Sequence, residues 1–296
     1  MHTAKQITPS VPKSVIGHVP YYAKVGHRLS DMSLDDLEWP IGRPEGTVGM
    51  TVGDLGPDAH LYSYPRRWLY TGALKGLKAR ISLLIVEPAS FHRHHMWLAK
   101  IFHRRFYRIL TCNPSLLAAI PNGVFFVFGS TWVPDWRDRD LTKTRMLSLI
   151  ASKKRNLPGH KLRHKIVSQM RSAGISADVL GRGYSAFDVK ADGLAPYRYS
   201  VVIENSRELG YFTEKLIDAL LLKTVPIYWG APDISKYFDP VGIMICTTEA
   251  EIMTAISKIS LVDYLARVDA IGKNQQQAVK YGNILKSAAR VIEATL

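Results

Sequence analysis

Short apolar runs, separated by polar loops that contain glycine or proline, mark the middle of the chain. Residues 81–86 (ISLLIV), 107–111 and 123–128 are short, apolar and rich in branched or aromatic side chains, as buried strands are. Residues 91–106, between the first two runs, are long enough for a helix. Because strands alternate here with a helical segment, we expect a parallel sheet covered by helices.

The same alternation restarts after a polar, charged break at residues 132–140 (WVPDWRDRD). Further apolar runs predict a second set of strands. Helices are predicted where apolar residues recur at helical spacing and where end signals occur, such as Thr213 as an N-cap. The span 262–292 should break near Gly272 or Gly282. The expected strands are 146–151, 177–180, 199–203 and 225–229, and the expected helices are 161–173, 213–223, 252–259 and 262–292.

These patterns predict an α/β fold with two sheets. We expect an N-terminal domain over 1–140, a second domain over 141–275 and a closing helix over 276–296. Residues 1–50 predict no clear elements, and residues 52–65 are rich in turn formers. In open parallel sheets ligands bind beyond the carboxyl ends of the strands, so the loops after Val86, Ala151 and Ile203 are expected to form the site.

The composition says more about the cellular compartment of the protein than about the reaction it performs. The chain has 296 residues, 47% of them hydrophobic, and its two cysteines cannot build a disulfide framework. No apolar run reaches the roughly 18 residues of a membrane helix, and residues 1–24 lack a secretory signal, so we expect a complete cytoplasmic protein. The net charge of +14 favours phosphates, acidic glycans, nucleic acid or a membrane surface as partners and does not choose among them.

Residues 204–215 (ENSRELGYFTEK) are the richest in candidate chemistry. They link a strand to a helix, and the free N–H groups at a helix N-terminus favour an anion. Lys215 falls in the first turn, where the helix dipole disfavours a cation unless a phosphate is bound, and Glu214 is suited to sugar hydroxyls. A capped surface helix with Lys215 in water explains the same residues, so both interpretations stay open.

Other charged groups have a functional and a structural explanation as well. Lys161 and Arg163 open a helix after the basic loop 153–160, and a guanidinium can grip a diphosphate, but a solvated basic face is the simpler interpretation. Asp138 and Asp140 have the spacing of a metal-binding pair but lie in the charged break. The cluster of His92, His94 and His95 suggests metal ligands, although a basic helix face near acceptor or membrane is favoured.

One stretch resembles a known family. Residues 199–219 (YSVVIENSRELGYFTEKLIDA), followed by 225–232 (VPIYWGAP), strongly resemble the donor-domain signature of the alpha-1,3/4-fucosyltransferases, glycosyltransferase family 10. That signature is an apolar strand, Glu-Asn-Ser, a loop with Tyr, Thr-Glu-Lys, a helix and Val-Pro-Ile-Tyr-Trp-Gly. The similarity is best over 146–238 and weaker over 81–132.

The resemblance implies a GT-B-like fold, in which two Rossmann-type domains face each other across a cleft. It implies GDP-fucose as donor, a glycan acceptor and inversion at the anomeric carbon. The N-terminal domain would then bind the acceptor and the second domain the donor. By position in the motif, Arg163 and Lys215 would neutralise the diphosphate, Asn205, Tyr211 and Glu214 would contact nucleotide or sugar, and Glu87 would be the general base. Asp54 and Asp58 are the next carboxylates to consider for that role.

We therefore expect a soluble, bacterial-type fucosyltransferase that forms an alpha-1,3 linkage in cell-surface polysaccharide or lipopolysaccharide. No cofactor or metal is expected to be required, and manganese or magnesium would at most stimulate. Peripheral contact with the anionic inner membrane is left open, and no nucleic acid is expected. The alternatives are transfer from another GDP-sugar on the same fold and, less favoured, a basic module that binds nucleic acid or membrane.

Overall fold

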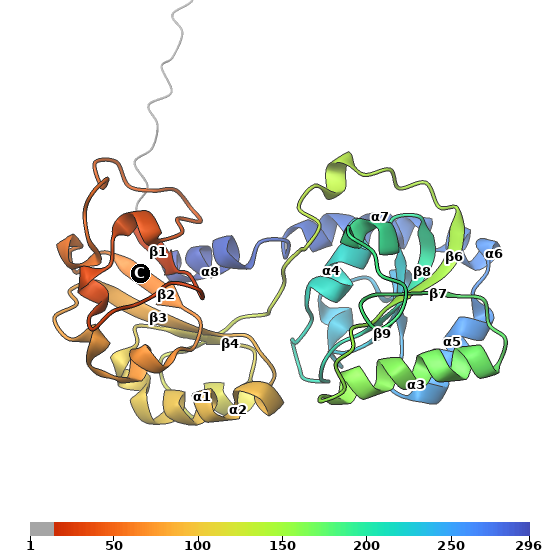
Figure 1. Cartoon of the computed structure of the whole chain (residues 1–296), viewed down its shortest axis with the longest axis horizontal. Helices are drawn as coiled ribbons and strands as arrows, with labels where there is room; N and C mark the ends of the chain where they lie inside the picture. Colours follow the sequence, from red (N-terminus) through yellow and green to blue (C-terminus); the bar gives the residue numbers. More distant parts are fainter. Residues whose placement is uncertain (1–14) are drawn as a thin grey trace, which may run out of the picture.

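Two α/β lobes lie side by side, each built on its own parallel sheet (Figure 1). The computed structural model describes residues 15–296, without the side chains of residues 89–91. The two sheets have five strands each, and every strand pairs in parallel with its neighbours. The expected α/β fold with two sheets facing a cleft, of the GT-B type, is confirmed.

In the N-terminal lobe the strands follow one another in space as they do in sequence. Two of them, β1 and β2, were not expected from the sequence. Their sequences, IGHV and HLYS, mix apolar and polar residues, yet all eight residues are buried. The lobe contains β1 (Ile16–Val19), β2 (His60–Ser63), β3 (Arg80–Ile85), α1 (Ala89–Phe102), β4 (Ile109–Thr111), α2 (Pro114–Leu117) and β5 (Gly123–Phe125).

The last helix of the chain, α8 (Ile284–Glu293), packs on the N-terminal sheet (Figure 1). Its buried alanines and Ile292 share a core cluster with Tyr62, Leu84 and Leu110 from three strands of that sheet. The Tyr62 hydroxyl also donates a hydrogen bond to the Leu285 carbonyl oxygen at 2.8 Å. The chain therefore crosses between the lobes twice.

The C-terminal lobe has the strand order β10-β9-β8-β6-β7. From β6 the chain goes first to β7 on one side and then to β8 on the other, so the two connections leave a crevice at the carboxyl ends of β6 and β8. The lobe contains β6 (Arg145–Ile150), α3 (Pro158–Ser172), β7 (Asp178–Leu180), β8 (Tyr197–Ile203), α4 (Glu214–Leu221), β9 (Val225–Trp229), β10 (Met244–Ile245), α5 (Glu249–Lys258), α6 (Leu261–Ala266) and α7 (Val268–Val279).

Several expected helices begin or end at other residues than the sequence predicts. Pro158 begins α3 three residues before the expected start, because a proline at the first helical position is tolerated there. The expected break at Gly282 is confirmed, whereas Gly272 lies inside α7 and a further break falls at Arg267. None of the helices in residues 15–296 combines the length and the apolar character needed to span a bilayer.

The first crossing between the lobes is anchored to the C-terminal lobe by Asp218, a fully buried carboxylate of α4. Its Oδ1 accepts hydrogen bonds from the Thr131 hydroxyl at 2.6 Å and the Trp132 backbone N–H at 3.1 Å. The Lys190 ammonium lies 2.6 Å from Oδ2 and neutralises the charge. A buried carboxylate needs such partners, so this network holds the crossing in place.

Candidate functional site

A cavity of about 370 Å³ lies between the lobes, at the crevice beyond β6 and β8. Val86, Glu87, Phe128 and Trp132 line it from the N-terminal lobe and the crossing, and the C-terminal lobe supplies the rest. The three loops after β3, β6 and β8, which the sequence pointed to, all contribute. The six residues named by the resemblance all line this one cavity: Glu87, Arg163, Asn205, Tyr211, Glu214 and Lys215.

The start of α3 is packed tightly against the end of β8. The Gly159 N–H donates a hydrogen bond to the Asn205 carbonyl oxygen at 3.1 Å. A β-carbon at Gly159 would lie 1.7 Å from the Glu204 carbonyl oxygen, so only glycine fits at this position. This contact brings the N-terminal part of α3 and its side chains to the edge of the cavity.

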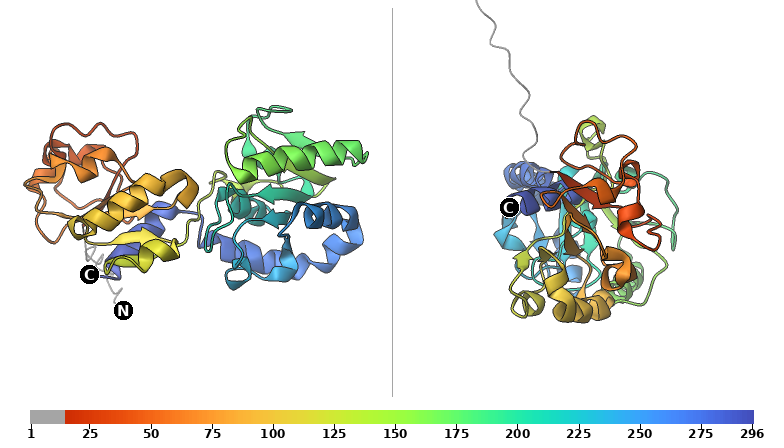
Figure 2. Two further views of the ribbon diagram at one scale, coloured as in Figure 1. Left: turned by 90° about the horizontal axis from the view of Figure 1, so that it is seen from below. Right: turned by 90° about the vertical axis from the view of Figure 1, so that its left-hand side faces the viewer.

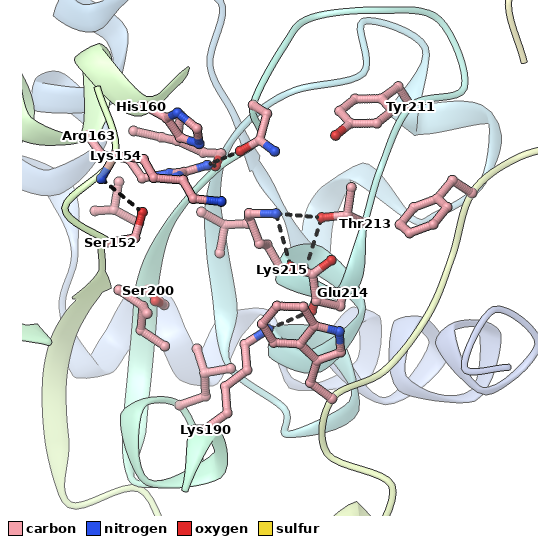
Figure 3. A pocket seen from close by; sticks show the side chains of 18 of the residues that line it. Ser152, Lys154, His160, Arg163, Lys190, Ser200, Tyr211, Thr213, Glu214 and Lys215 are labelled. Atoms are coloured by element: carbon pink, nitrogen blue, oxygen red, sulfur yellow. Dashed lines mark hydrogen bonds and ion pairs between the residues drawn. The ribbon is translucent and has the colours of Figure 1, made fainter. Parts of the chain in front are cut away.

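Arg163 is buried, so the solvated basic face that the sequence favoured for it is wrong. Its Nε donates to the Ile203 carbonyl oxygen at 2.9 Å, and one terminal nitrogen donates to the Asn205 Oδ1 at 3.0 Å. Burial lowers the pKa of Arg163, while the charges of Glu204 and Glu214 oppose that shift. The guanidinium is thus held at the carboxyl end of β8, beside the crevice (Figure 3).

Thr213 links the loop after β8 to α4. It is the N-cap of α4, where its hydroxyl oxygen accepts from the Lys215 N–H at 3.3 Å. The backbone N–H and the hydroxyl of Thr213 donate to the two carboxylate oxygens of Glu204 at 2.8 and 2.7 Å. Glu204 is fully buried, and burial raises its pKa against the opposing charge of Lys215.

Lys215 lies among carboxylates and not in water. Its ammonium donates to the Thr213 hydroxyl oxygen at 3.1 Å and to Glu214 Oε1 at 3.0 Å, and lies 3.7 Å from Glu204 Oε2 (Figure 3). Burial alone would raise the pKa of Glu214, but the charges of Lys215 and Lys190 together lower it. Glu214 is therefore an ionised acceptor, and Lys215 a fixed positive charge, at the first turn of α4.

Glu87 follows β3 and approaches the same cavity from the N-terminal lobe. Burial raises its pKa, and this shift is opposed by the positive charge of Lys215 and increased by the negative charge of Glu214. The carboxylate thus lies within electrostatic reach of the α4 residues across the cleft.

Tyr211 makes a nearby contact between the lobes, because its backbone pairs with that of Phe128 in an isolated bridge. Its buried ring lines the cavity (Figure 3).

Asp54 and Asp58, the reserve candidates for the base, do not line the cavity. Asp54 caps a short helical turn instead, accepting from the Thr51 N–H at 2.8 Å, and both aspartates are exposed. Lys161 is also exposed, on the solvent side of α3. Asp138 and Asp140 remain outside the cleft, and nowhere in residues 15–296 do three His, Cys, Asp or Glu side chains form a group that could hold a metal.

Several cavity residues were missed from the sequence. Ser152, Lys154 and His160 come from the loop after β6 and the start of α3. The position of this loop after an apolar strand pointed to it as part of the site, but these three residues were not named. Burial, with the nearby charge of Arg163, lowers the pKa of His160 to about 4, so its imidazole is neutral at pH 7.

Lys190 and Trp132 could not have been found from local sequence. Lys190 lies in the loop before β8, and its ammonium is 4.7 Å from the centroid of the Trp132 ring. Its ion pair with the buried Asp218 fixes this position. A cation above an aromatic ring is attracted to the ring face, so this contact holds together two residues that both line the cavity.

The comparisons with known proteins agree with this architecture. The model of the family described as "Glycosyltransferase family 10 (fucosyltransferase) C-term" matches residues 141–283. Alpha-(1,3)-fucosyltransferase FucT of Helicobacter pylori is 45% identical over 51 residues, which are 17% of this chain and 11% of that relative. The match therefore spans about a tenth of the relative's length.

One solved structure is similar in fold, and a second superposes less closely. The structure of Alr3699/HepE of Anabaena in complex with UDP superposes with a TM-score of 0.54 at 11% identity, over 80% of this chain and 78% of that chain. An alpha1,3-fucosyltransferase structure with GDP-fucose superposes with a TM-score of 0.49 at 17% identity, over 76% of this chain and 72% of that chain. The fold is shared with the first of these, and residues 141–283 match the model of the C-terminal domain of glycosyltransferase family 10.

Proposed function

We propose that this protein is an inverting glycosyltransferase that transfers fucose from GDP-fucose to a hydroxyl group of a glycan acceptor. The observation that carries the proposal is the arrangement of the cavity, in which Glu87 comes from one lobe and Arg163, Glu214 and Lys215 come from the other. The fucosyltransferase family model that matches residues 141–283 supports GDP-fucose as the donor, and so does the name of the H. pylori relative.

In this proposal the donor diphosphate binds where the N-terminus of α4 meets Lys215 and Arg163. Free N–H groups at a helix N-terminus and two cationic side chains suit an anion, and they neutralise the charge that develops on the leaving GDP. Both cations are already held by hydrogen bonds to protein groups, so little reorganisation is needed when the donor arrives. Asn205, Tyr211 and Glu214 would contact the nucleotide or the fucose.

Glu87 would remove the proton from the acceptor hydroxyl. A sugar hydroxyl is a poor nucleophile until its proton is taken, and a positioned carboxylate accelerates such a step by about 10²–10⁴-fold. Because Glu87 belongs to the lobe opposite the proposed phosphate-binding residues, base and leaving group would lie on opposite sides of the anomeric carbon. That geometry would lead to inversion of configuration. The raised pKa of Glu87 makes it a stronger base than an exposed carboxylate.

The finer parts of the proposal concern the acceptor, the roles of the domains and the need for a metal ion. The N-terminal domain over 1–140 would bind the acceptor, a cell-surface polysaccharide or lipopolysaccharide chain receiving an alpha-1,3 linkage in the cytoplasm. The domain over 141–275 would bind the donor, and 276–296 would close the fold. Because Lys215 and Arg163 supply positive charge at the diphosphate, we propose that activity persists in excess EDTA even if manganese or magnesium stimulates it.

The full chain should be tested first with a panel of GDP, GDP-fucose, GDP-mannose and UDP in thermal unfolding. Ligands that bind the native state raise the apparent melting temperature. GDP and GDP-fucose should raise it, UDP should not, and GDP-fucose should release GDP when an oligosaccharide acceptor is added. Equal stabilisation by UDP would contradict the donor assignment, and turnover of GDP-mannose in place of GDP-fucose would favour the alternative that another GDP-sugar is used.

A further inference from the structure

The positive charge of the protein is concentrated in one part of the N-terminal lobe. From Arg66 to Pro134 the sequence contains ten Lys and Arg residues and a single acidic residue, Glu87. This segment therefore has a net charge of +9, out of +14 for the whole chain. Glu87 lines the internal cavity between the lobes, so no carboxylate of this segment offsets the charge of its outer surface.

Helix α1 presents a regular basic and apolar stripe to solvent. Arg93, Trp97, Lys100, Ile101 and Arg104 follow one another at the spacing of one helix face, with Arg104 in the short turn that continues α1. The Trp97 and Ile101 residues are 61% and 52% exposed. The opposite face of α1 packs into the lobe through the buried Met96 and Ala99, so the outer stripe is not needed for the core.

The basic residues of this stripe make little contact within the fold, apart from a long hydrogen bond of 3.5 Å from the Lys100 ammonium to the Ser115 hydroxyl oxygen. Within residues 15–296, Arg93, Lys100 and Arg104 form no ion pair with a carboxylate. Arg105, next to them, has a structural role, because its guanidinium donates to the carbonyl oxygens of Tyr70 and Thr71 at 3.0 and 2.6 Å. The stripe thus combines unpaired cations with two large apolar side chains that remain in water.

We propose that this outer face of α1 docks onto the surface of an anionic lipid bilayer. Trp97 and Ile101 would enter the boundary between headgroups and acyl chains, and Arg93, Lys100 and Arg104 would bind lipid phosphates. The two apolar side chains favour a bilayer over nucleic acid or a soluble acidic glycan. On a polyanion they would stay in water, whereas tryptophan is suited to the membrane interface.

If the outer face of α1 docks on a bilayer, the position of α1 determines where the cleft of the proposed transferase lies. The helix begins two residues after Glu87, so one of its ends lies at the cleft. Figure 1 shows α1 along the lower edge of the N-terminal lobe and α3 along the lower edge of the C-terminal lobe, and Figure 2 shows this side uncovered when viewed from below. Docking through α1 would bring the cleft next to the bilayer, which, if the proposed function holds, favours acceptors carried on lipids.

Sedimentation of the full chain with vesicles tests the docking directly and needs no turnover, so its result is independent of the proposed activity. The vesicles are phosphatidylcholine alone or phosphatidylcholine with about 30% phosphatidylglycerol, an anionic fraction chosen so that charge-driven binding can be measured. Binding is expected with the anionic vesicles, weaker or absent binding with phosphatidylcholine alone, and a loss of affinity as salt increases. An equal amount bound to both vesicle types, or none to either, overturns the proposal.

Two variants separate the charged from the apolar contribution. Substituting Arg93, Lys100 and Arg104 together by glutamine should weaken binding to the anionic vesicles at least tenfold, because each charge near the surface contributes to affinity. The double variant Trp97→Ser with Ile101→Ser should also weaken it at least tenfold. Circular dichroism and the melting temperature establish that both variants fold, and fluorescence of Trp97 should shift to shorter wavelength on binding in the unsubstituted chain.

Matched substitutions on helices other than α1 serve as controls. Val262→Ser with Leu265→Ser removes another exposed apolar pair of a helix, and Lys258, Lys273 and Lys286 to glutamine removes three exposed charges elsewhere. Both controls should keep the affinity of the unsubstituted chain within about threefold. If the serine pair on α1 binds normally while the glutamine triple does not, the stripe is a site for soluble polyanions such as nucleic acid, and the bilayer proposal is wrong.

Discussion

Glu204, at the end of β8, accepts two hydrogen bonds from Thr213, one from the backbone N–H at 2.8 Å and one from the hydroxyl at 2.7 Å. The same hydroxyl oxygen accepts from the Lys215 ammonium at 3.1 Å. Thr213 therefore couples a buried carboxylate to the cation that we propose binds the donor. The first prediction follows from this coupling.

Thr213→Val removes the hydroxyl with little change in shape. We expect a loss of stability of about 1–3 kcal/mol, because α4 loses its N-cap and Glu204 loses a buried hydrogen bond. GDP affinity should fall as well, since the Lys215 ammonium loses one of the groups that hold it in place. Chemical denaturation and calorimetry measure the two effects, with Thr248→Val, the N-cap of α5, as a control that loses stability but keeps GDP affinity. Unchanged GDP affinity in Thr213→Val would contradict the coupling.

Lys215→Ala tests the phosphate contact itself. A charge-assisted hydrogen bond contributes about 1.5–3 kcal/mol, so GDP should bind about tenfold more weakly or worse. Lys236→Ala, an exposed lysine of the same lobe, is the control and should bind GDP normally. If both variants bind GDP equally well, Lys215 does not contact the diphosphate.

Arg163→Lys keeps a positive charge but not the paired donors of a guanidinium. Because Arg163 also bonds the Ile203 carbonyl oxygen and the Asn205 side chain, we expect a lower melting temperature together with weaker GDP binding. Arg155→Lys, an exposed position in the basic loop, is the matched control. The structural role of Arg163 is refuted if the melting temperature stays unchanged, and its role toward the donor if GDP affinity does.

Glu87→Gln preserves the size of the side chain but cannot accept a proton. We expect kcat to fall by about 10²–10⁴-fold while GDP-fucose binding stays near normal, because the opposite lobe holds the donor. Turnover and donor affinity should be measured on one preparation, beside Asp58→Asn as an exposed control from the same lobe. Turnover within about threefold of the unsubstituted enzyme shows that another group is the base.

The pH dependence gives a second measurement on Glu87. Since burial raises its pKa above the ordinary 4.5, and the base must be ionised, kcat should fall with decreasing pH at a higher pH than for an exposed carboxylate. The acidic limb should be absent from the residual activity of Glu87→Gln.

His160→Gln tests the neutral buried imidazole. The pKa of His160 is about 4 in the folded protein against 6.5 ordinarily, so below pH 6.5 the unfolded chain takes up a proton that the folded protein does not. The free energy of unfolding should therefore decline as pH falls from 6.5 toward 4. Denaturation curves over this range should show a smaller decline for His160→Gln, and an unchanged one for the exposed His27→Gln. Identical declines in wild type and His160→Gln would refute this contribution.

Much of the C-terminal lobe could be predicted because its signals are local. The strand β9 has the bounds expected from residues 225–229, and α4 starts next to its expected N-cap Thr213. The strands β1 and β2 could not be predicted, because their buried faces include His18, His60 and Ser63 and show no clear period. Burial on both sides of a parallel sheet removes the alternation that identifies a strand.

The sequence by itself determined the α/β class and the strand ends at which to look for a site, since the periods and end signals of these elements are local. Its resemblance to a known family named the six residues that line one cavity. Only the tertiary structure decided how deeply those residues are buried and which groups they contact. Arg163 is buried at the end of β8, Lys215 lies between two carboxylates, and Lys190 enters from a distant loop through the buried Asp218. These outcomes depend on burial and on partners remote in sequence, which set the cost of a charge and which no local pattern encodes.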